Sequence, residues 1–302
     1  MKYVIAGGSG SLGQRLARRL EADGGGVVVL TRDPSRVRHG RPVAWDARTV
    51  GPWAAELEGA IVVNLAGQLV DRRPTSANIK MLRSSRVDAT LALKRAVAEN
   101  GWTAPLWLQM SSLAVYGDAG DLILDESASP VRPLPQMTGV AEPWERAADG
   151  VAADRVVVLR TGIVLDVGTP ALDRLVTLTR LGLGGRIASG RQWISWIHID
   201  DFLGAVCHII DTPGISDVVH VTSPAPAPNR DLMAALRRAL RRPPALPTPT
   251  QAARAGAWLM GTDPALALTG RRCVPAKLEG AGYEFAWPTI DLALADLLSS
   301  SI

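Results

Sequence analysis

Five short runs of mainly apolar residues alternate with amphipathic stretches in the first half of the chain, and this alternation restricts the folds that the chain can adopt. The runs are Tyr3–Ala6, Val27–Thr31, Ile61–Leu65, Leu106–Met110 and Arg155–Arg160. Near-continuous apolar runs of this kind are typical of parallel strands that are buried on both faces. Helical spacing is found in three further stretches, Leu12–Ala22, Ile79–Ala98 and Ala141–Val151. Together they predict an α/β fold with a doubly wound parallel sheet.

The second half of the chain has a different character. Proline becomes frequent after about residue 165 and divides the sequence into short pieces. At 302 residues, the chain is long enough for one large domain with an appended lobe. We therefore expect a sheet domain over residues 1–165, to which some later segments return, and a smaller α+β substrate lobe over residues 166–302. Ligands of open α/β sheets bind outside the C-terminal strand ends, where such a lobe would close a cleft.

The strongest motif is Gly7-Gly8-Ser9-Gly10-Ser11-Leu12-Gly13, which follows the first expected strand and opens the first helix. Glycines at 7, 10 and 13 allow a tight turn, close approach of the backbone to a phosphate, and close packing of the helix on the strand. The helix N-terminus presents free N–H groups and the positive end of its dipole to a pyrophosphate. In this strand–turn–helix context the motif predicts a Rossmann-type dinucleotide-binding domain.

The end of the second expected strand bears on which dinucleotide is bound. NAD enzymes usually have an acidic residue there, which accepts hydrogen bonds from the ribose hydroxyls. Here the strand ends in Leu30-Thr31-Arg32, with Arg36 one helical turn further on. Since Arg32 can pair with a 2′-phosphate, the sequence favours NADP(H) over NAD(H). Asp33 leaves NAD(H) open as the alternative, and a solvated loop position is the other interpretation of Arg32.

Two more turns follow expected strands. The small residues of Asn64-Leu65-Ala66-Gly67 would let the backbone approach the ribose of a bound cofactor. In the second turn, Ser111–Gly117, the hydroxyl of Ser112 would hydrogen-bond a substrate carbonyl or alcohol. Tyr116 is a candidate proton donor, although its ordinary pKa of about 10 would have to be lowered for it to act as a base.

These three motifs, in this order, resemble those of the extended short-chain dehydrogenases/reductases. The likeness narrows to an atypical, YfcH-like subfamily known as epimerase family proteins, which has a distinctive C-terminal domain, and it covers nearly the whole chain. Further segments that carry it are Arg160–Leu165, Leu183–Gly185, Gly190–Asp201, Val274–Leu278 and Gly282–Phe285. The expected cofactor contacts are Gly7, Gly10, Ser11, Leu12, Gly13, Thr31, Arg32, Arg36, Asp46, Leu65, Ala66, Gly67, Ser111, Thr161, Gly162 and Val164. The expected substrate contacts are Gln192, Trp193, Trp196 and His198.

The chain departs from active members of the superfamily at the residues that move protons. Active dehydrogenases use a Tyr-x-x-x-Lys pair as proton donor and as the group that lowers its pKa. The corresponding positions hold Met137 and Ala141, and the subfamily generally lacks the pair as well. Sugar-nucleotide epimerases also commonly carry an Arg where this chain has Ile194, which weakens the expectation of a nucleotide-sugar substrate.

Alternatives stay open for the second lobe. Trp193 and Trp196 would either line an apolar ligand pocket or belong to the core of the lobe. His198 would either contact a ligand or be a hydrogen-bonded structural residue. Asp201 is expected to cap the helix that follows it.

Two functions fit these patterns. The first is an NADP(H)-dependent oxidoreductase or epimerase that acts on a small carbonyl or alcohol, with Ser112 and Tyr116 as candidate catalytic residues. The second is a non-catalytic NADP(H)-binding redox sensor or regulatory protein. The net charge of +4 is scattered along the chain and does not indicate nucleic-acid binding. Because no stretch approaches about 20 apolar residues and the two cysteines and four histidines show no metal spacing, we expect a cytoplasmic protein without metal or membrane contact, with a homodimer left open.

Overall fold

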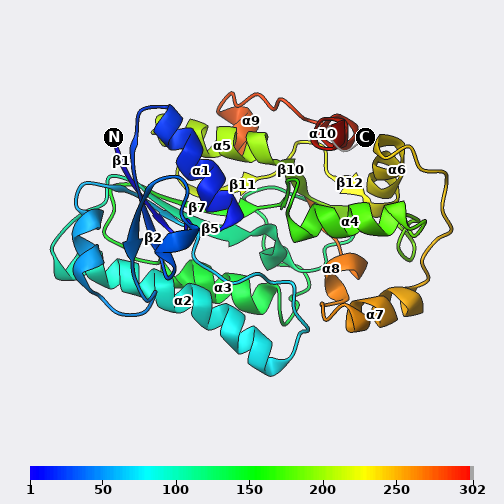
Figure 1. The fold of residues 1–302 in the computed structure, drawn as a ribbon, viewed down its shortest axis with the longest axis horizontal. Helices are drawn as coiled ribbons and strands as arrows, with labels where there is room; N and C mark the ends of the chain where they lie inside the picture. Colours follow the sequence, from blue (N-terminus) through cyan, green and yellow to red (C-terminus); the bar gives the residue numbers. More distant parts are fainter. Residues whose placement is uncertain (300–302) are drawn as a thin grey trace.

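Seven parallel strands form the central sheet of the molecule (Figure 1). The computed structural model describes residues 1–299. The order of the seven strands across the sheet is β11-β7-β5-β4-β1-β2-β3. The strands are β1 (Lys2–Ala6), β2 (Gly26–Thr31), β3 (Arg41–Ala44), β4 (Ile61–Asn64), β5 (Trp107–Ser112), β7 (Val156–Thr161) and β11 (Asp217–Val221). Because every neighbouring pair is parallel, the C-terminal ends of the strands lie along one edge of the sheet.

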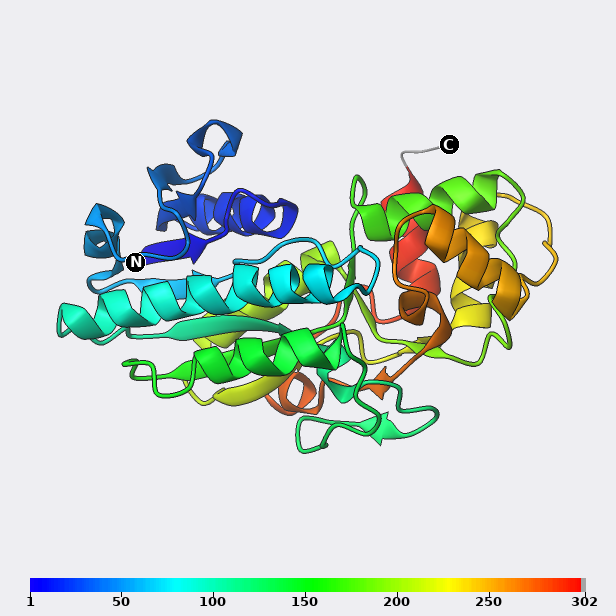
Figure 2. The same cartoon turned by 90° about the horizontal axis from the view of Figure 1, so that it is seen from below.

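Helices cover both faces of this sheet (Figures 1 and 2). Successive side chains of a strand point to opposite faces, so that Ile5 of β1 packs in the core beneath α1 and α5, whereas Val4 packs in the core beneath α2. Helix α3 lies alongside α2 (Figure 2). These helices are α1 (Ser11–Ala22), α2 (Ser76–Glu99), α3 (Thr138–Ala147) and α5 (Ile199–Asp211). Three short 3₁₀ helices span Pro34–Arg36, Pro52–Leu57 and Leu113–Tyr116.

The second lobe lies beyond the C-terminal edge of the sheet, on the right in Figure 1, and is built mainly from helices. They are α4 (Pro170–Arg180), α6 (Asn229–Ala239), α7 (Thr250–Leu259), α8 (Ala265–Leu268) and α10 (Ile290–Leu298), while α9 (Ala276–Gly280) lies near β11. Three two-stranded pairs connect the loops: β8 (Ile163–Leu165) with β10 (Trp196–His198), β9 (Trp193–Ile194) with β12 (Ala227–Pro228), and β6 (Ile123–Leu124) with β13 (Arg272–Cys273). Segments far apart in the sequence thus lie together beyond the C-terminal edge of the sheet (Figure 1).

The fold predicted from the sequence is confirmed. All five expected strands and all three expected helices are present, although α3 begins at Thr138 and ends at Ala147 rather than running from 141 to 151. The sequence pattern did not reveal β3, whose four residues are largely exposed, or β11. Both β11 and α5 return to the sheet domain from beyond residue 165. Residues 300–302 of the predicted lobe lie outside the described residues.

Candidate functional site

The glycine-rich turn between β1 and α1 is closed at Gly7, Gly8 and Gly13 and open at Gly10. Gly7 has a φ of +74°, and a Cβ there would lie 2.7 Å from Cα of Ala66. A Cβ on Gly13 would lie 2.4 Å from Cα of Gly8, so neither position has room for a side chain. At Gly10, by contrast, a Cβ would meet only the carbonyl oxygen of Gly7, at 3.6 Å. The exposed backbone of Gly10 is therefore where a phosphate can approach.

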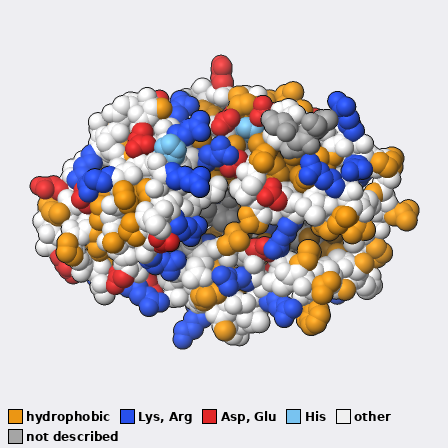
Figure 3. All heavy atoms as spheres, viewed as in Figure 1, with side chains coloured by type: hydrophobic (Ala, Val, Ile, Leu, Met, Phe, Trp, Pro, Cys, Tyr) orange, Lys and Arg blue, Asp and Glu red, His pale blue; other side chains and the backbone are white. Residues whose placement is uncertain are grey.

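Helix α1 begins at this open glycine. No side chain caps its N-terminus, so the N–H groups of its first turn are left for a ligand or for water. Ser11 is exposed and Leu12 is partly buried at this helix start. Figure 3 shows lysine and arginine side chains gathered around a hollow near the middle of the face seen in Figure 1. Both the helix dipole and these charges favour an anionic ligand.

The end of β2 lies next to the turn. The side chain of Thr31 is buried, and its hydroxyl lies 2.9 Å from Oγ of Ser9, so Thr31 supports the glycine turn from below instead of facing the solvent. The carboxylate of Asp33 accepts hydrogen bonds from the N–H and hydroxyl of Ser35. Arg32 and Arg36 are both exposed, and neither has an ion-pair partner within residues 1–299. The two guanidinium groups are thus available to an anion, while Oδ1 of Asp33 is held by Ser35.

Asp46 follows β3 at the same edge of the sheet. Its carboxylate accepts hydrogen bonds from the N–H groups of Arg48 and Thr49 and from the hydroxyl of Thr49. These bonds lower the pKa of Asp46 to about 2, so the side chain is ionised at neutral pH. It is also exposed, and it keeps lone pairs for a further donor.

The turn after β4 is held by a buried asparagine. The amide of Asn64 donates to Oγ1 of Thr90 at 2.8 Å and to Oε1 of Gln109 at 3.0 Å, and its oxygen accepts from the N–H of Ala66. A Cβ on Gly67 would lie 2.9 Å from Cζ of Arg86. The polypeptide from Leu65 to Gly67 is therefore held against the sheet edge, with Gly67 exposed to the cleft side.

Ser112 ends β5 and begins the next turn. Its side chain is partly exposed, and its Oγ accepts a hydrogen bond from the N–H of Ala114 at 3.2 Å. The hydroxyl proton is left for a bound molecule. Met137 and Ala141, at the positions of the missing Tyr and Lys, are both buried. Neither of them has a proton to exchange, so Ser112 is the remaining polar group of the expected catalytic set that reaches the surface.

Tyr116 is fully buried, and its hydroxyl is enclosed by two basic side chains. It accepts a hydrogen bond from Nη1 of Arg160 at 2.8 Å and lies 2.7 Å from Nε2 of His220. Because Nδ1 of His220 lies 2.9 Å from the carbonyl oxygen of Val274, Nδ1 carries the proton and Nε2 accepts from Tyr116. Burial raises the pKa of Tyr116 to about 12 and lowers that of His220. These contacts argue against the proton-donor role expected for Tyr116.

An ion pair continues this buried network. Arg160 binds Glu145 of α3 in a bidentate manner, with Nε and Nη2 lying 3.0 Å and 2.9 Å from the two carboxylate oxygens. The hydroxyl of Ser111 donates to the same carboxylate. Ser111 is therefore committed to α3, and the expected cofactor contact at this residue is left to its backbone. The network joins β5, β7 and β11 to the C-terminal region through Val274.

The segment after β7 contributes mainly backbone atoms to the C-terminal edge of the sheet. The hydroxyl of Thr161 is buried and donates within its own strand. A Cβ on Gly162 would lie 2.9 Å from the carbonyl oxygen of Ser195, which explains the glycine. Val164 of β8 is partly buried. These residues lie at the C-terminal sheet edge, and their close backbone packing leaves no side-chain donor from Thr161.

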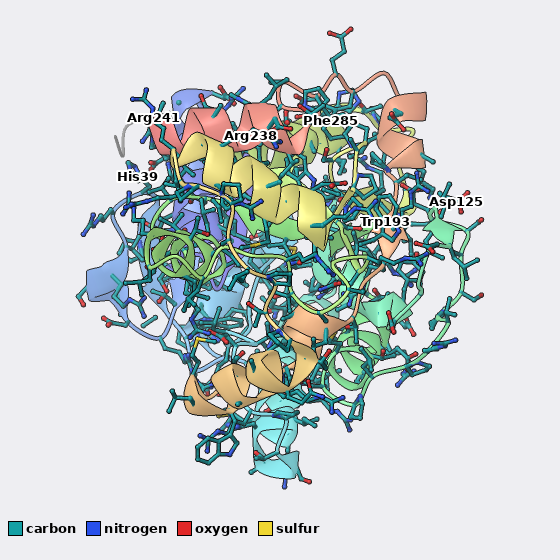
Figure 4. The ribbon with its side chains drawn as sticks, turned by 90° about the vertical axis from the view of Figure 1, so that its right-hand side faces the viewer. His39, Asp125, Trp193, Arg238, Arg241 and Phe285 are labelled. Atoms are coloured by element: carbon teal, nitrogen blue, oxygen red, sulfur yellow. The ribbon has the colours of Figure 1, made fainter. Side chains whose placement is uncertain are left out.

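The two expected substrate contacts before β10 lie at the outer side of the second lobe. Trp193 is partly buried, and its Nε1 donates to Asp121 at 2.8 Å on the side of the molecule shown in Figure 4. It lines a shallow surface pocket together with Asp121, Arg191, Pro228 and Arg230. The amide of Gln192 donates to the carbonyl oxygens of Ile187 and Ala267, so Gln192 ties loops together.

The other two expected substrate contacts are core residues, and here the prediction needs correction. Trp196 is fully buried and its Nε1 donates to the carbonyl of Ala225 at 3.1 Å. His198 is 1% exposed and stacks on Trp287, with ring centroids 4.0 Å apart. Its Nδ1 accepts from the N–H of Asp200, so that His198 caps α5. Neither side chain has a surface to offer a substrate.

Asp201 does not cap α5 as expected. Its two carboxylate oxygens accept from the N–H groups of Ala286 and Trp287, and its backbone carbonyl accepts from the hydroxyl of Tyr283. Asp201 therefore anchors the segment around Tyr283 and Phe285 to the sheet domain.

Sequence reasoning missed three residues that the structure brings to the site. His220 contacts the hydroxyl of Tyr116 directly, and Glu145 binds Arg160, which contacts the same hydroxyl. Arg271 of the C-terminal region contacts Gly117 and Met137. A polar residue on an otherwise buried strand, such as His220 in β11, is a usable signal. Arg271 lies in a loop whose spacing carries no such signal.

A doubly wound sheet with an open glycine turn at its C-terminal edge defines a Rossmann-type dinucleotide-binding protein. Residues 3–139 match the NAD dependent epimerase/dehydratase family, and residues 248–297 match a domain of unknown function, DUF1731. The chain is 32% identical to bovine epimerase family protein SDR39U1, over 99% of this chain and 100% of that one. It is 36% identical to an epimerase family protein of Mycobacterium bovis, over 96% of this chain and 95% of that one.

Solved structures of related proteins support the same family assignment. Human SDR39U1, crystallised with NADPH, superposes with a TM-score of 0.86 at 28% identity and covers 99% of both chains. A nucleoside-diphosphate sugar epimerase from Corynebacterium glutamicum superposes with a TM-score of 0.78 at 29% identity, over 99% of this chain and 58% of that one. The chain belongs to the SDR39U1-type epimerase family of extended short-chain dehydrogenases/reductases, with its C-terminal DUF1731 domain. Within residues 1–299, no helix combines the length and the apolar character needed to cross a membrane.

Proposed function

We propose that this protein is an NADP(H)-dependent oxidoreductase or epimerase that acts on a small carbonyl or alcohol. The observation that carries the proposal is the end of β2, where Arg32 and Arg36 are exposed without ion-pair partners while Asp33 is engaged by Ser35. A 2′-phosphate supplies the anion that these guanidinium groups lack. The human relative crystallised with NADPH supports the same cofactor.

The residues present fit such a dinucleotide. The N–H groups of Ser11 and Leu12 in the first turn of α1 would hold the pyrophosphate, and the exposed Arg32 would hold the 2′-phosphate. The backbone at Gly67 would pass beside a ribose. When bound, the nicotinamide supplies the hydride acceptor or donor. The protein contributes the position of the two reactants and the exclusion of water from the cleft.

Ser112 is the group of this chain that we assign to the substrate. Its hydroxyl proton would be donated to a carbonyl oxygen, which orients the carbonyl and stabilises negative charge that develops on it. Proton transfer at that oxygen would come from water or from the substrate, because Met137 and Ala141 carry no exchangeable side-chain proton and Tyr116 is enclosed. We therefore expect slow turnover.

The test is a titration of cofactor-free protein with NADPH and NADH, followed by energy transfer from tryptophan, and then a carbonyl screen with the preferred cofactor. The proposal requires tighter binding of NADPH. A Ser112→Ala variant should retain NADPH affinity and lose about tenfold or more in turnover, whereas Ser127→Ala, a surface change, should alter neither. Absence of binding by both dinucleotides would overturn the proposal.

A second candidate function is a non-catalytic NADP(H)-binding redox sensor or regulatory protein. The buried Met137 and Ala141 at the positions of the missing pair favour it. A sensor would bind NADPH and NADP⁺ with different affinities and would bind a partner protein in only one of these states. An enzyme would instead consume NADPH with at least one carbonyl compound.

The homodimer stays a prediction, and light scattering in solution would measure whether the protein is a monomer or a dimer.

A further inference from the structure

Arg271 reaches from the C-terminal domain to the turn that Ser112 begins. Its Nε donates to the carbonyl oxygen of Gly117 at 3.0 Å, and its Nη2 lies 3.4 Å from Sδ of Met137. The backbone of Arg271 is anchored on both sides, because its N–H donates to the carbonyl of Trp193 and its own carbonyl accepts from Ser195. The position of this guanidinium is therefore set by the fold and not by a flexible loop.

The guanidinium of Arg271 has fewer acceptors than those of Arg86, Arg155 and Arg160, while the neighbouring Arg272 stacks on Trp193 and leaves its Nε without a hydrogen-bond partner within residues 1–299. Arg155 donates to four backbone carbonyls at the end of α5. Arg160 is paired with Glu145 at both ends of its fork, and Arg86 donates to two carbonyls and is covered by the ring of Trp144. Arg271, in contrast, has one oxygen and one sulfur acceptor for five N–H donors.

The charge of Arg271 is also uncompensated. Within residues 1–299, no carboxylate lies within ion-pair distance of it. Asp118 is near enough to favour the charged form, but its carboxylate accepts from the N–H of Gly270. Burial lowers the pKa of Arg271, yet an arginine stays protonated at neutral pH. Arg271 is partly exposed and its Nη1 is not buried, so an anionic group can replace the water at this nitrogen.

Arg271 lies beside the segments that would border a bound substrate. Met137 stands where active relatives are expected to have their tyrosine, and Gly117 ends the turn that starts at Ser112. Arg271 therefore touches both segments that would border a substrate carbonyl. Its planar fork matches a carboxylate, which accepts two parallel hydrogen bonds.

We propose that Arg271 binds the carboxylate of the substrate, so that the preferred substrates are small 2-oxo or 2-hydroxy acids and not neutral carbonyl compounds. This inference rests on the proposed function, because only an enzyme has a substrate. The binding of a carboxylate by Arg271 can nevertheless be measured without turnover. Arg271 is a specificity residue in this scheme, and Ser112 addresses the neighbouring carbonyl.

The experiment compares phenylglyoxylate with its uncharged methyl ester by calorimetry, with and without NADP⁺. The variants are Arg271→Gln, Arg271→Lys, and Arg242→Gln as a control on an exposed arginine of the same lobe. Wild type and Arg242→Gln should prefer the acid over the ester by about tenfold or more. Arg271→Gln should lose this preference while its melting temperature and NADPH affinity stay unchanged.

Two results overturn the inference: a wild-type protein with no preference for the acid, or a preference that survives in Arg271→Gln. If Arg271→Gln does not fold, the Arg271→Lys variant tests the inference instead. It keeps the positive charge but loses the planar guanidinium, so it should weaken binding of the acid by about tenfold. Failure of the proposed function has a different signature. In that case NADPH does not bind the wild type, while the preference for the acid measured without dinucleotide still decides the role of Arg271.

Discussion

The hydroxyl of Tyr116 donates a hydrogen bond to Nε2 of His220 over 2.7 Å, and both side chains are fully buried. Tyr116 lies in the turn after β5, whereas His220 lies in the edge strand β11. Since Nδ1 of His220 is bound to the carbonyl of Val274, the pair links the sheet domain to the DUF1731 domain. This role in domain docking accounts for a tyrosine in the expected catalytic turn that does not reach the cleft.

Replacing Tyr116 by Phe should therefore affect stability more than chemistry. The change leaves Nη1 of Arg160 and Nε2 of His220 without a partner in a buried site, which costs about 2 kcal/mol of unfolding free energy. Urea unfolding of the variant measures this loss. Tyr3→Phe is the matched control, because within residues 1–299 the Tyr3 hydroxyl hydrogen-bonds only to Sδ of Met1. A turnover loss of more than about tenfold at a temperature where Tyr116→Phe is folded would return Tyr116 to the catalytic residues.

His220 should make the protein sensitive to acid. Burial lowers its pKa from the ordinary 6.5, Arg160 acts in the same direction, and Glu126 and Asp125 act against it. The unfolded chain therefore binds a proton near pH 6.5 that the native chain binds only at lower pH. The unfolding free energy contributed by His220 is complete above pH 6.5 and is lost as the pH falls toward the native pKa.

Urea unfolding between about pH 5 and pH 8 tests this window. The His220→Asn variant should show a flatter dependence than wild type, whereas His39→Asn, at a partly exposed site seen in Figure 4, should retain the wild-type slope. Equal slopes for wild type and His220→Asn would contradict the assignment of a neutral, buried His220.

The open and closed glycines should respond differently to alanine. In Gly13→Ala the added Cβ would lie 2.4 Å from Cα of Gly8, so we expect a loss of about 3 kcal/mol in stability. Gly10→Ala adds a methyl group that meets only an oxygen at 3.6 Å, so its stability cost is about 1 kcal/mol, from a poorer N-cap. Its NADPH affinity should nevertheless fall about tenfold or more, because the methyl group occupies the path of the phosphate. Unchanged NADPH binding by folded Gly10→Ala would mean that the dinucleotide does not pass this turn.

Arg32 should decide between the two dinucleotides. Removing its charge in Arg32→Ala should weaken NADPH binding by about 10- to 100-fold, the range expected for one charge-assisted contact, and leave NADH binding almost unchanged. Fluorescence titration with both cofactors measures the ratio. Arg18→Ala, on the exposed face of α1, is the control for a general loss of positive charge. If both affinities fall equally in Arg32→Ala, the 2′-phosphate is bound elsewhere.

Local sequence determined the architecture of the sheet domain. Runs such as Val27–Thr31 have no polar alternation and are rich in β-branched residues, which is typical of strands buried on both faces. The glycines at 7, 10 and 13 have the spacing of a strand–turn–helix junction. The confirmed family and the position of Ser112 at a strand end also follow from contiguous motifs. These features depend on residues that are neighbours along the chain.

Only the tertiary structure decided what the side chains of the expected site do. Tyr116, Trp196 and His198 look like site residues in sequence, but partners from 29 to 104 positions away along the chain engage or enclose them. Arg271 looks unremarkable in sequence, yet the fold brings it from the C-terminal domain to the position of the missing tyrosine. Burial and hydrogen-bond partners are long-range properties, because they depend on which distant segments pack together, and the charge pattern of a single segment does not contain them.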